Sequence, residues 1–427
     1  MLAMQTKLLL VAGVVIAGGT LVLALAPQGA PQAPADDALV AKARAIHERV
    51  ITIDTHDDIP GNFATPEVDP GVRGNRQVDL PKMREGGLDV VFFVVFVGQG
   101  PRTPEAYEKA KADAMAKFEG IHRLAEQMHP DQIALAYTPD DVERLVKSGK
   151  LVTVIGVENG YPIGKDLSLV KRFHELGGRY ITLAHGGHND IADSATPRQN
   201  EPAAEHNGLS EFGKQVVAEM NRVGLMVDVS HVSKQAALDA IKTSKAPVIA
   251  SHSGARAVNE HPRNMDDETL LALKANGGVM QAVALGGFVK NDPPEKSEAV
   301  RALRAELGLA GGPGGGLAAL TPEKRAEYEK RRAALDEKWP PANVQDFVNH
   351  IDHAVKLIGI DHVGISSDFD GGGGVKGWNN AAESPNVTIE LVRRGYTEDE
   401  IRKLWGGNLL RVWREVEKKA KEIQKGH

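Results

Sequence analysis

After residue 50, the chain alternates short apolar runs with longer segments in which apolar and polar residues are mixed. The runs are rich in Val, Ile and Phe and nearly continuous, as expected for strands that are buried on both faces of a parallel sheet. Eight such runs occur, at residues 50–54, 88–97, 151–158, 180–185, 225–231, 247–252, 278–284 and 362–368. They predict eight buried parallel strands.

The segments between the runs carry helix-start signals. Thr103-Pro104 and Thr138-Pro139 each place a capping hydroxyl directly before a proline at the first helical position. Near the C-terminus, Thr397 begins a capping box ahead of a long amphipathic segment. Eight strands that alternate with helices predict an α/β protein with a (β/α)8 TIM-type barrel and insertions. A doubly wound open sheet is the alternative architecture.

Two segments exceed what a barrel needs. Residues 186–208, after the fourth strand, form a long polar loop that we expect to shape the entrance to a site. Residues 286–343 hold a glycine-rich stretch and then a strongly charged helical segment. We expect this second segment to be a surface insertion whose charges are solvated.

The first 35 residues differ in composition from the rest of the chain. Lys7 precedes an uncharged, mostly apolar stretch at 8–26, and a spacer rich in Pro and Ala follows. This pattern fits both a cleaved export signal, with small residues for cleavage at 33–35, and an uncleaved anchor. We therefore expect residues 1–35 to be a signal peptide or signal anchor with a spacer. Residues 36–427 would then be an exported barrel domain, periplasmic or anchored facing outside the cytoplasm.

Charge and cysteine content narrow the range of functions. The formal net charge is -6, and no block of basic residues provides a surface for nucleic acid. The chain has no cysteine, which excludes disulfides, thiolate zinc sites and a cysteine nucleophile. Any metal ion must therefore be held by histidine and carboxylate side chains.

Ionisable side chains lie at the ends of six predicted strands, the edge at which a (β/α)8 barrel carries its functional residues. They are His56, Asp58, Glu158, His185, His231, His252 and Asp368. A single strand-end histidine is more often a hydrogen-bonded structural residue than a ligand. Crowded together without a cation, however, these groups would destabilise the fold, so the pattern predicts a metal site.

The number of candidate ligands suggests two metal ions, because one catalytic zinc takes about three protein ligands and a water. His56, Asp58 and Glu158 would hold one ion. His231 and His252 would hold the other, and the Glu158 carboxylate would bridge both. Two such ions share a hydroxide that forms near neutral pH. Zinc is our expectation, although these ligands also accept manganese, cobalt or iron.

Three further residues complete a peptide site. Asp368 is placed to pass a proton from water to the leaving amine, and His185 to stabilise a developing oxyanion. Arg263, just beyond the sixth strand, suits bidentate binding of a substrate carboxylate. Taken alone, Arg263 would be an ordinary loop cation.

The chain resembles the renal or membrane dipeptidase family, a branch of the metal-dependent amidohydrolase barrels. Matching segments run in order from about residue 50 to 413 and include IDTHDDIP, GVENGYPIG, YITLAHGGHNDIADSA, APVIASHSGARAV, HPRNMDDETL and HVGISSDFDG. The absence of cysteines makes it more similar to bacterial exported members than to animal ones. The resemblance implies cleavage of dipeptides, with tolerance of a D-residue at the C-terminal position.

The resemblance also implies residue roles that agree with the assignments above. His56 and Asp58 would bind one zinc ion and His231 and His252 the other, with Glu158 bridging; His185 would contact the scissile group, Arg263 the carboxylate, and Asp368 would transfer the proton. We expect Tyr161 and the 186–208 loop to shape the pocket.

Two alternative functions stay open from the sequence. One is hydrolysis of N-acyl amino acids or other amides at the same site. The other is a non-catalytic or tailoring role in an exported biosynthetic pathway. The expected partner is a dipeptide or small amide, with no nucleic acid and with membrane attachment only through the N-terminal segment; a homodimer is left open.

Overall fold

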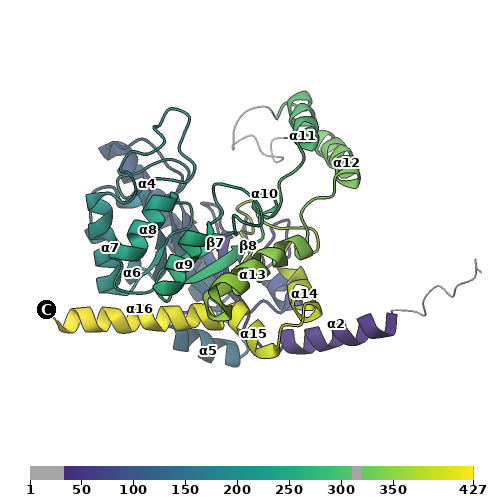
Figure 1. Ribbon diagram of the computed structural model, residues 1–427, viewed down its shortest axis with the longest axis horizontal. Helices are drawn as coiled ribbons and strands as arrows, with labels where there is room; N and C mark the ends of the chain where they lie inside the picture. Colours follow the sequence, from purple (N-terminus) through teal and green to yellow (C-terminus); the bar gives the residue numbers. More distant parts are fainter. Residues whose placement is uncertain (1–32, 310–319, 427) are drawn as a thin grey trace, which may run out of the picture.

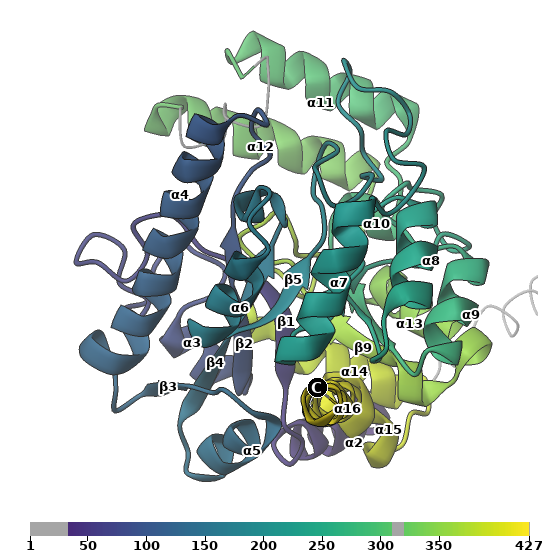
Figure 2. The ribbon, with the colours of Figure 1, turned by 90° about the vertical axis from the view of Figure 1, so that its left-hand side faces the viewer.

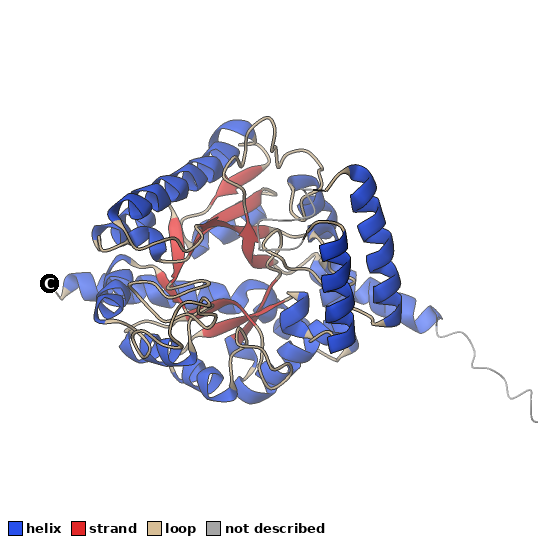
Figure 3. Ribbon diagram, turned by 90° about the horizontal axis from the view of Figure 1, so that it is seen from above, coloured by secondary structure: helices blue, strands red, loops and turns tan. Residues whose placement is uncertain are grey.

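Eight parallel strands form a closed ring with helices around it, in a computed structural model that describes residues 33–309 and 320–426 (Figure 1, Figure 3). The ring order is β1 (Ile53–Asp58), β2 (Val90–Phe96), β4 (Leu151–Glu158), β5 (Gly178–Thr182), β6 (Met226–Asp228), β7 (Ile249–Ser253), β8 (Val279–Val283) and β9 (Val363–Ser366). These strands correspond to the eight predicted runs. The short strand β3 (Ile133–Leu135) pairs only with β4, outside the ring.

The ring closes between β1 and the end of β9. The Asp58 amide donates a hydrogen bond of 2.9 Å to the Phe369 carbonyl, and Asp57 and Phe369 form a parallel bridge. The predicted (β/α)8 barrel is therefore confirmed, and the open doubly wound sheet is wrong.

The first strand differs in position from its prediction. The apolar run at 50–54 gives only the start of β1, which begins at Ile53 and continues to Asp58. His56 and Asp58 therefore lie within the strand, and its hydrogen bonds to β2 and to the segment after β9 fix their backbone.

The helices surround the ring and cover its lower end. They are α2 (Ala33–His47), α3 (Leu80–Gly86), α4 (Pro104–Arg123), α5 (Pro139–Lys147), α6 (Ser168–Glu175), α7 (Glu211–Val223), α8 (Lys234–Thr243), α9 (Asp267–Ala275), α10 (Gly286–Val289), α11 (Pro294–Glu306), α12 (Pro322–Lys338), α13 (Val344–Ile358), α14 (Pro385–Arg393), α15 (Glu398–Arg402) and α16 (Asn408–Lys425). Figure 2 shows α16 end-on below the barrel. Its apolar face, with Leu409 and Trp413, packs in one buried cluster with residues of the barrel strands, including Phe92 and Tyr180. The opposite end of the ring is left for the site.

The predicted insertion, residues 286–343, contains α10 and a hairpin of α11 and α12 that projects beyond the barrel (Figure 1). The hairpin has its own small core, formed by Leu303, Leu307, Leu309 and Tyr328. Lys296, in α11 ahead of the charged helical segment, differs from the exposed charges of the insertion because its side chain is fully buried. Its ammonium lies 2.8 Å from Asp292 Oδ1 and 2.9 Å from Asp336 Oδ1, so neighbouring carboxylates replace its water.

The predicted leader lies outside the described residues, except for its last three residues, which begin α2. Across 33–309 and 320–426, no helix has both the length and the apolar character that crossing a bilayer requires.

Candidate metal centre and active site

The seven strand-end residues converge at one end of the barrel. His56 and Asp58 come from β1, Glu158 from β4 and His252 from β7. The others follow directly after strands β5, β6 and β9: they are His185, His231 and Asp368. Ligand atoms of these residues form three overlapping groups, each with its atoms within 4.8 Å of one another. The groups are His56–Glu158–His252, Glu158–His185–His231 and His56–Asp58–Asp368.

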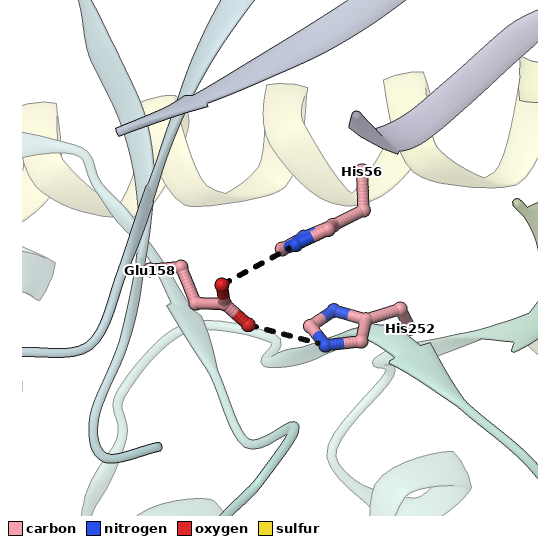
Figure 4. Close-up of side chains that lie close together, drawn as sticks. All are labelled: His56, Glu158 and His252. Carbon is pink, nitrogen blue, oxygen red and sulfur yellow. Dashed lines mark ion pairs between the residues drawn. The ribbon is translucent and has the colours of Figure 1, made fainter. Parts of the chain in front are cut away.

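Glu158 is shared by two of these groups. Its Oε1 lies 2.9 Å from His231 Nε2, 3.3 Å from His252 Nε2 and 3.7 Å from His185 Nε2. Its other oxygen, Oε2, lies 3.5 Å from His56 Nε2. Figure 4 shows the carboxylate between His56 and His252, with one oxygen directed at each ring. This divergent placement is what a bridging carboxylate requires.

Two further carboxylates lie on the β1 side of the cluster. Asp58 Oδ2 is 3.7 Å and Asp368 Oδ1 is 3.8 Å from His56 Nε2. The backbone of Asp368 has a φ of 59°, and His231 has a φ of 68°, conformations that a non-glycine residue adopts at a cost. The surrounding fold thus holds the backbone of both residues in a strained conformation at the site.

The ring of His56 is oriented by Tyr180. The Tyr180 hydroxyl donates a hydrogen bond to the Thr55 carbonyl (3.1 Å), so it accepts one from His56 Nδ1 (3.0 Å). The proton therefore occupies Nδ1, and the lone pair of Nε2 faces the cluster. Nε2 is buried and has no hydrogen-bond partner among the described residues.

The ring of His252 is oriented by a similar chain of hydrogen bonds. The Ser251 hydroxyl donates to Asp228 Oδ2 (2.6 Å) and accepts from His252 Nδ1 (2.8 Å). Hydrogen bonds that hold the distal nitrogen of a histidine and direct the other nitrogen inward are typical of metal ligands. His252 Nε2 therefore also presents a lone pair to the cluster.

The arrangement of these nitrogens fits a metal site. His231 Nε2 lies 2.7 Å from His252 Nε2, and both rings lie against the same Glu158 oxygen. Buried lone pairs and a carboxylate at this spacing repel one another unless a cation lies among them. Imidazole and carboxylate are donors that suit Zn²⁺ and related divalent ions.

Burial and neighbouring charges perturb the titration of the site residues. Burial alone would raise the pKa of Glu158, but the surrounding imidazoles hold that pKa well below its usual range. Burial lowers the pKa of His231 and His252 well below their usual value, so their rings are neutral and available as ligands. Burial also raises the pKa of Asp368 well above its usual value. The Asp58 and Glu158 carboxylates raise this pKa further, whereas the charge of His56 lowers it. Such opposed shifts in one cluster are typical of a catalytic site.

The cluster lines a cleft of about 780 Å³, together with segments that follow seven of the eight barrel strands. Arg263 lines this cleft and its side chain is buried, and burial lowers its pKa to about 10. Its Nη2 donates to the His252 carbonyl (3.2 Å), and its guanidinium lies 5.2 Å from the centre of the Phe288 ring. No carboxylate pairs with it in the described part of the chain, so it has donors to offer a substrate.

Tyr161 does not line the cleft. Its side chain is 3% exposed, packs against Tyr107, and its hydroxyl donates to the Pro101 carbonyl at 2.6 Å. The hydroxyl of Tyr161 is therefore used within the protein, and any effect of Tyr161 on the shape of the pocket is indirect. The 186–208 loop does reach the cleft, through Gly186 and Arg198.

Sequence reasoning missed several residues of the cleft and its supports. Phe96 and Lys117 line the cleft from β2 and α4, and Phe288 lines it from α10. Ser251 and Asp228 orient His252 from behind. Phe96 lies at the end of a predicted strand and Ser251 lies next to a predicted ligand, so their positions in the sequence could have indicated a place in the site. Lys117 and Phe288 lie in helical segments where the sequence gives no such signal.

Comparison with known proteins agrees with this geometry. The family model described as "Membrane dipeptidase (Peptidase family M19)" matches residues 40–427. Dipeptidase tcpJ of Claviceps purpurea is 34% identical over 354 residues, covering 82% of this chain and 71% of the relative. Dipeptidase aclJ of Aspergillus oryzae is 32% identical over 352 residues, covering 81% of this chain and 72% of the relative.

Solved structures show the same similarity. The crystal structure of the probable dipeptidase PvdM from Pseudomonas aeruginosa is 34% identical, with a TM-score of 0.79, and covers 90% of this chain and all of the other. A metallo peptidase from Rhodobacter sphaeroides shares the fold, with a TM-score of 0.67 and 23% identity over 86% of this chain and 99% of the other. With a family match over nearly its whole length and a convergent His and carboxylate cluster, the chain belongs to the membrane dipeptidase family of metal-dependent peptide hydrolases.

Proposed function

We propose that the chain is a binuclear zinc dipeptidase that cleaves dipeptides, including those with a C-terminal D-residue. The observation that carries the proposal is the position of Glu158, whose two oxygens face His56 on one side and His231 and His252 on the other. With Asp58 beside His56, these residues would hold two ions. Bound zinc ions would polarise the scissile carbonyl and lower the pKa of water.

The remaining groups have roles in the same reaction. Arg263 binds the substrate carboxylate through its guanidinium, because it is buried in the cleft and has no acidic partner among the described residues. Asp368 accepts a proton from the attacking water and returns it to the leaving amine. His185, which stacks on His231 with ring centres 4.0 Å apart, lies beside Glu158 and donates to the developing oxyanion.

The relatives support the substrate class. Two curated relatives are named dipeptidases, and the Rhodobacter sphaeroides structure contains a phosphinate mimic of the dipeptide L-Ala-D-Ala. The proposal also includes export from the cytoplasm, which rests on the composition of residues 1–35 alone.

The test is release of free alanine from L-Ala-L-Ala and L-Ala-D-Ala by the full chain, with metal content measured on the same sample. We expect both substrates to be cleaved, two zinc ions per chain, and loss of activity with a chelator. The Asp368→Asn variant should keep its zinc and lose turnover. A folded, zinc-loaded protein that cleaves N-acyl amino acids but neither dipeptide would contradict the proposal.

A further inference from the structure

The cleft contains a cation that the proposed reaction does not use. Lys117 projects from α4, and its ammonium lies 5.6 Å from the centre of the Phe96 ring, at the end of β2. Both residues line the cleft that holds the metal cluster. In the described part of the chain, no carboxylate lies within 4.0 Å of this ammonium, and it donates no hydrogen bond.

The other cations of the cleft are already engaged or assigned. Arg76 forms an ion pair with Asp370, with 3.0 Å between Nη2 and Oδ2. Arg198 extends from the 186–208 loop to the Gln99 carbonyl, and Arg263 is assigned to the substrate carboxylate. The ammonium of Lys117 is therefore a cation in the cleft that forms no ion pair with another described residue.

Lys117 is partly buried, which makes its unpaired ammonium costly. The surrounding protein lowers the pKa of Lys117, while the charges of Asp58 and Glu158 act in the opposite direction. An ammonium in such a setting gains from a carboxylate that a ligand brings close to it. The Phe96 ring contributes a cation–π contact that holds the head in place.

The position of Lys117 indicates which part of a substrate it meets. Arg263 follows β7, and Lys117 lies over the end of β2, four places away in the ring of eight strands. The two cations therefore lie on opposite sides of the barrel mouth, and both interact electrostatically with Glu158 between them. A dipeptide whose carboxylate is bound at Arg263 extends its amino-terminal residue toward Lys117.

We propose that Lys117 selects substrates with a carboxylate on the amino-terminal residue, that is, dipeptides beginning with Glu or Asp. The inference rests on the proposed function for the orientation of the substrate. It also explains why the cleft keeps a partly buried, unpaired cation on the side opposite Arg263.

The test compares L-Glu-L-Ala with L-Gln-L-Ala, which have nearly the same shape and differ in one charge. For the full, zinc-loaded chain we expect kcat/KM to be roughly tenfold or more higher for L-Glu-L-Ala, as a charge-assisted hydrogen bond provides. In Lys117→Met this preference should disappear through loss on L-Glu-L-Ala alone. In Lys117→Glu the substrate preference should shift toward L-Lys-L-Ala.

The matched control is Lys111→Met, on the same helix. Lys111 pairs with Glu108 at 3.0 Å and lies outside the cleft, so this variant should keep the wild-type preference. Equal kcat/KM for L-Glu-L-Ala and L-Gln-L-Ala in the wild type, or a preference that persists in Lys117→Met, would overturn the role of Lys117.

A binding measurement separates this inference from the proposed function. Analogues of both dipeptides, with CH2–NH in place of the peptide bond, bind without turnover and are compared by calorimetry. If no dipeptide is cleaved but the Glu analogue binds roughly tenfold more tightly than the Gln analogue only when Lys117 is present, the anion site stands and the proposed function fails. Equal binding of the two analogues would refute the anion site whatever the activity.

Discussion

At the scale of single residues, hydrogen bonds to the outer nitrogen of each histidine ring determine which nitrogen faces the cluster. Tyr180 fixes the His56 ring, and Ser251 with Asp228 fixes the His252 ring. Each contact occupies Nδ1 and leaves Nε2 directed at Glu158. The orientation of these candidate ligands therefore depends on residues that lie behind them, outside the cluster.

The Ser251→Ala substitution tests this dependence. Without the hydroxyl, the His252 Nδ1 proton has no acceptor, and the ring is free to change tautomer or rotate. We expect zinc affinity to fall by roughly 10–100-fold, as for other residues that support metal ligands. Affinity is measured by titration against a competing chelator, with circular dichroism to verify the fold.

Ser366→Ala is the matched control for this substitution. Ser366 is also a buried serine on a barrel strand, but its hydroxyl has no hydrogen-bond partner among the described residues. The Ser366→Ala substitution should leave the affinity for zinc unchanged. Equal affinities in Ser251→Ala and the wild type would show that His252 needs no such support.

At the scale of elements, the strands and the position of the insertion could be predicted, but the packing inside the insertion could not. Strands buried on both faces need continuous apolar runs, and all eight runs became strands of the ring. β3 was missed because three residues carry too little pattern. The sequence of 286–343 indicated a charged surface helix but not that α11 and α12 pack on each other around a small apolar core, with an ion pair between Lys296 and Asp336.

The candidate site could likewise be predicted only in part from the sequence. The convergence of the candidate ligands was predictable because each lies at or just after a strand end, where the barrel geometry brings distant residues together. Lys117 enters the cleft from the middle of α4, and Phe288 enters it from α10. Their placement depends on how a helix is rotated against the barrel, which an amphipathic pattern does not specify to one residue.

The Lys296 ion pairs predict how the hairpin responds to mutation. Asp336→Ala removes one of the two carboxylates that stabilise a fully buried ammonium, which is costly. We expect amide hydrogen exchange in α11 and α12 to accelerate at least severalfold, with no change in the barrel strands. Mass spectrometry of peptides from both regions measures the difference.

Glu337→Ala, a change at the next position along α12, provides the comparison. No ion pair joins Glu337 to another described residue, so its removal should leave exchange in the hairpin unchanged. Equal protection of α11 and α12 in Asp336→Ala and the wild type would mean that the small apolar core alone holds the hairpin.

At the scale of the whole molecule, the barrel depends on the junction between its first and last strands. Seven neighbouring pairs in the ring are joined by parallel pairing between named strands. The eighth junction is made by the bridge between Asp57 and Phe369, by the hydrogen bond from the Asp58 amide to the Phe369 carbonyl, and by Asp54 Oδ1, which accepts the Ser367 amide at 2.9 Å. Asp54 is fully buried, so this side chain substitutes for a backbone partner inside the core.

Replacing Asp54 therefore should weaken the whole barrel. In Asp54→Ala the buried Ser367 amide loses its acceptor, and we expect the free energy of unfolding to fall by about 1–3 kcal/mol. Asp54→Asn retains a carbonyl oxygen at the same position and should lose less of the free energy of unfolding.

Urea unfolding is followed by tryptophan fluorescence, with a chelator present so that differences in metal binding near His56 do not contribute. Trp378 and Trp405 contact each other in one buried cluster, and Trp413 lies in another. A single shared transition at lower urea would therefore show that the junction stabilises the molecule as a unit. If Asp54→Ala and Asp54→Asn unfold at the same urea concentration, the hydrogen bond to Ser367 does not hold the ring closed.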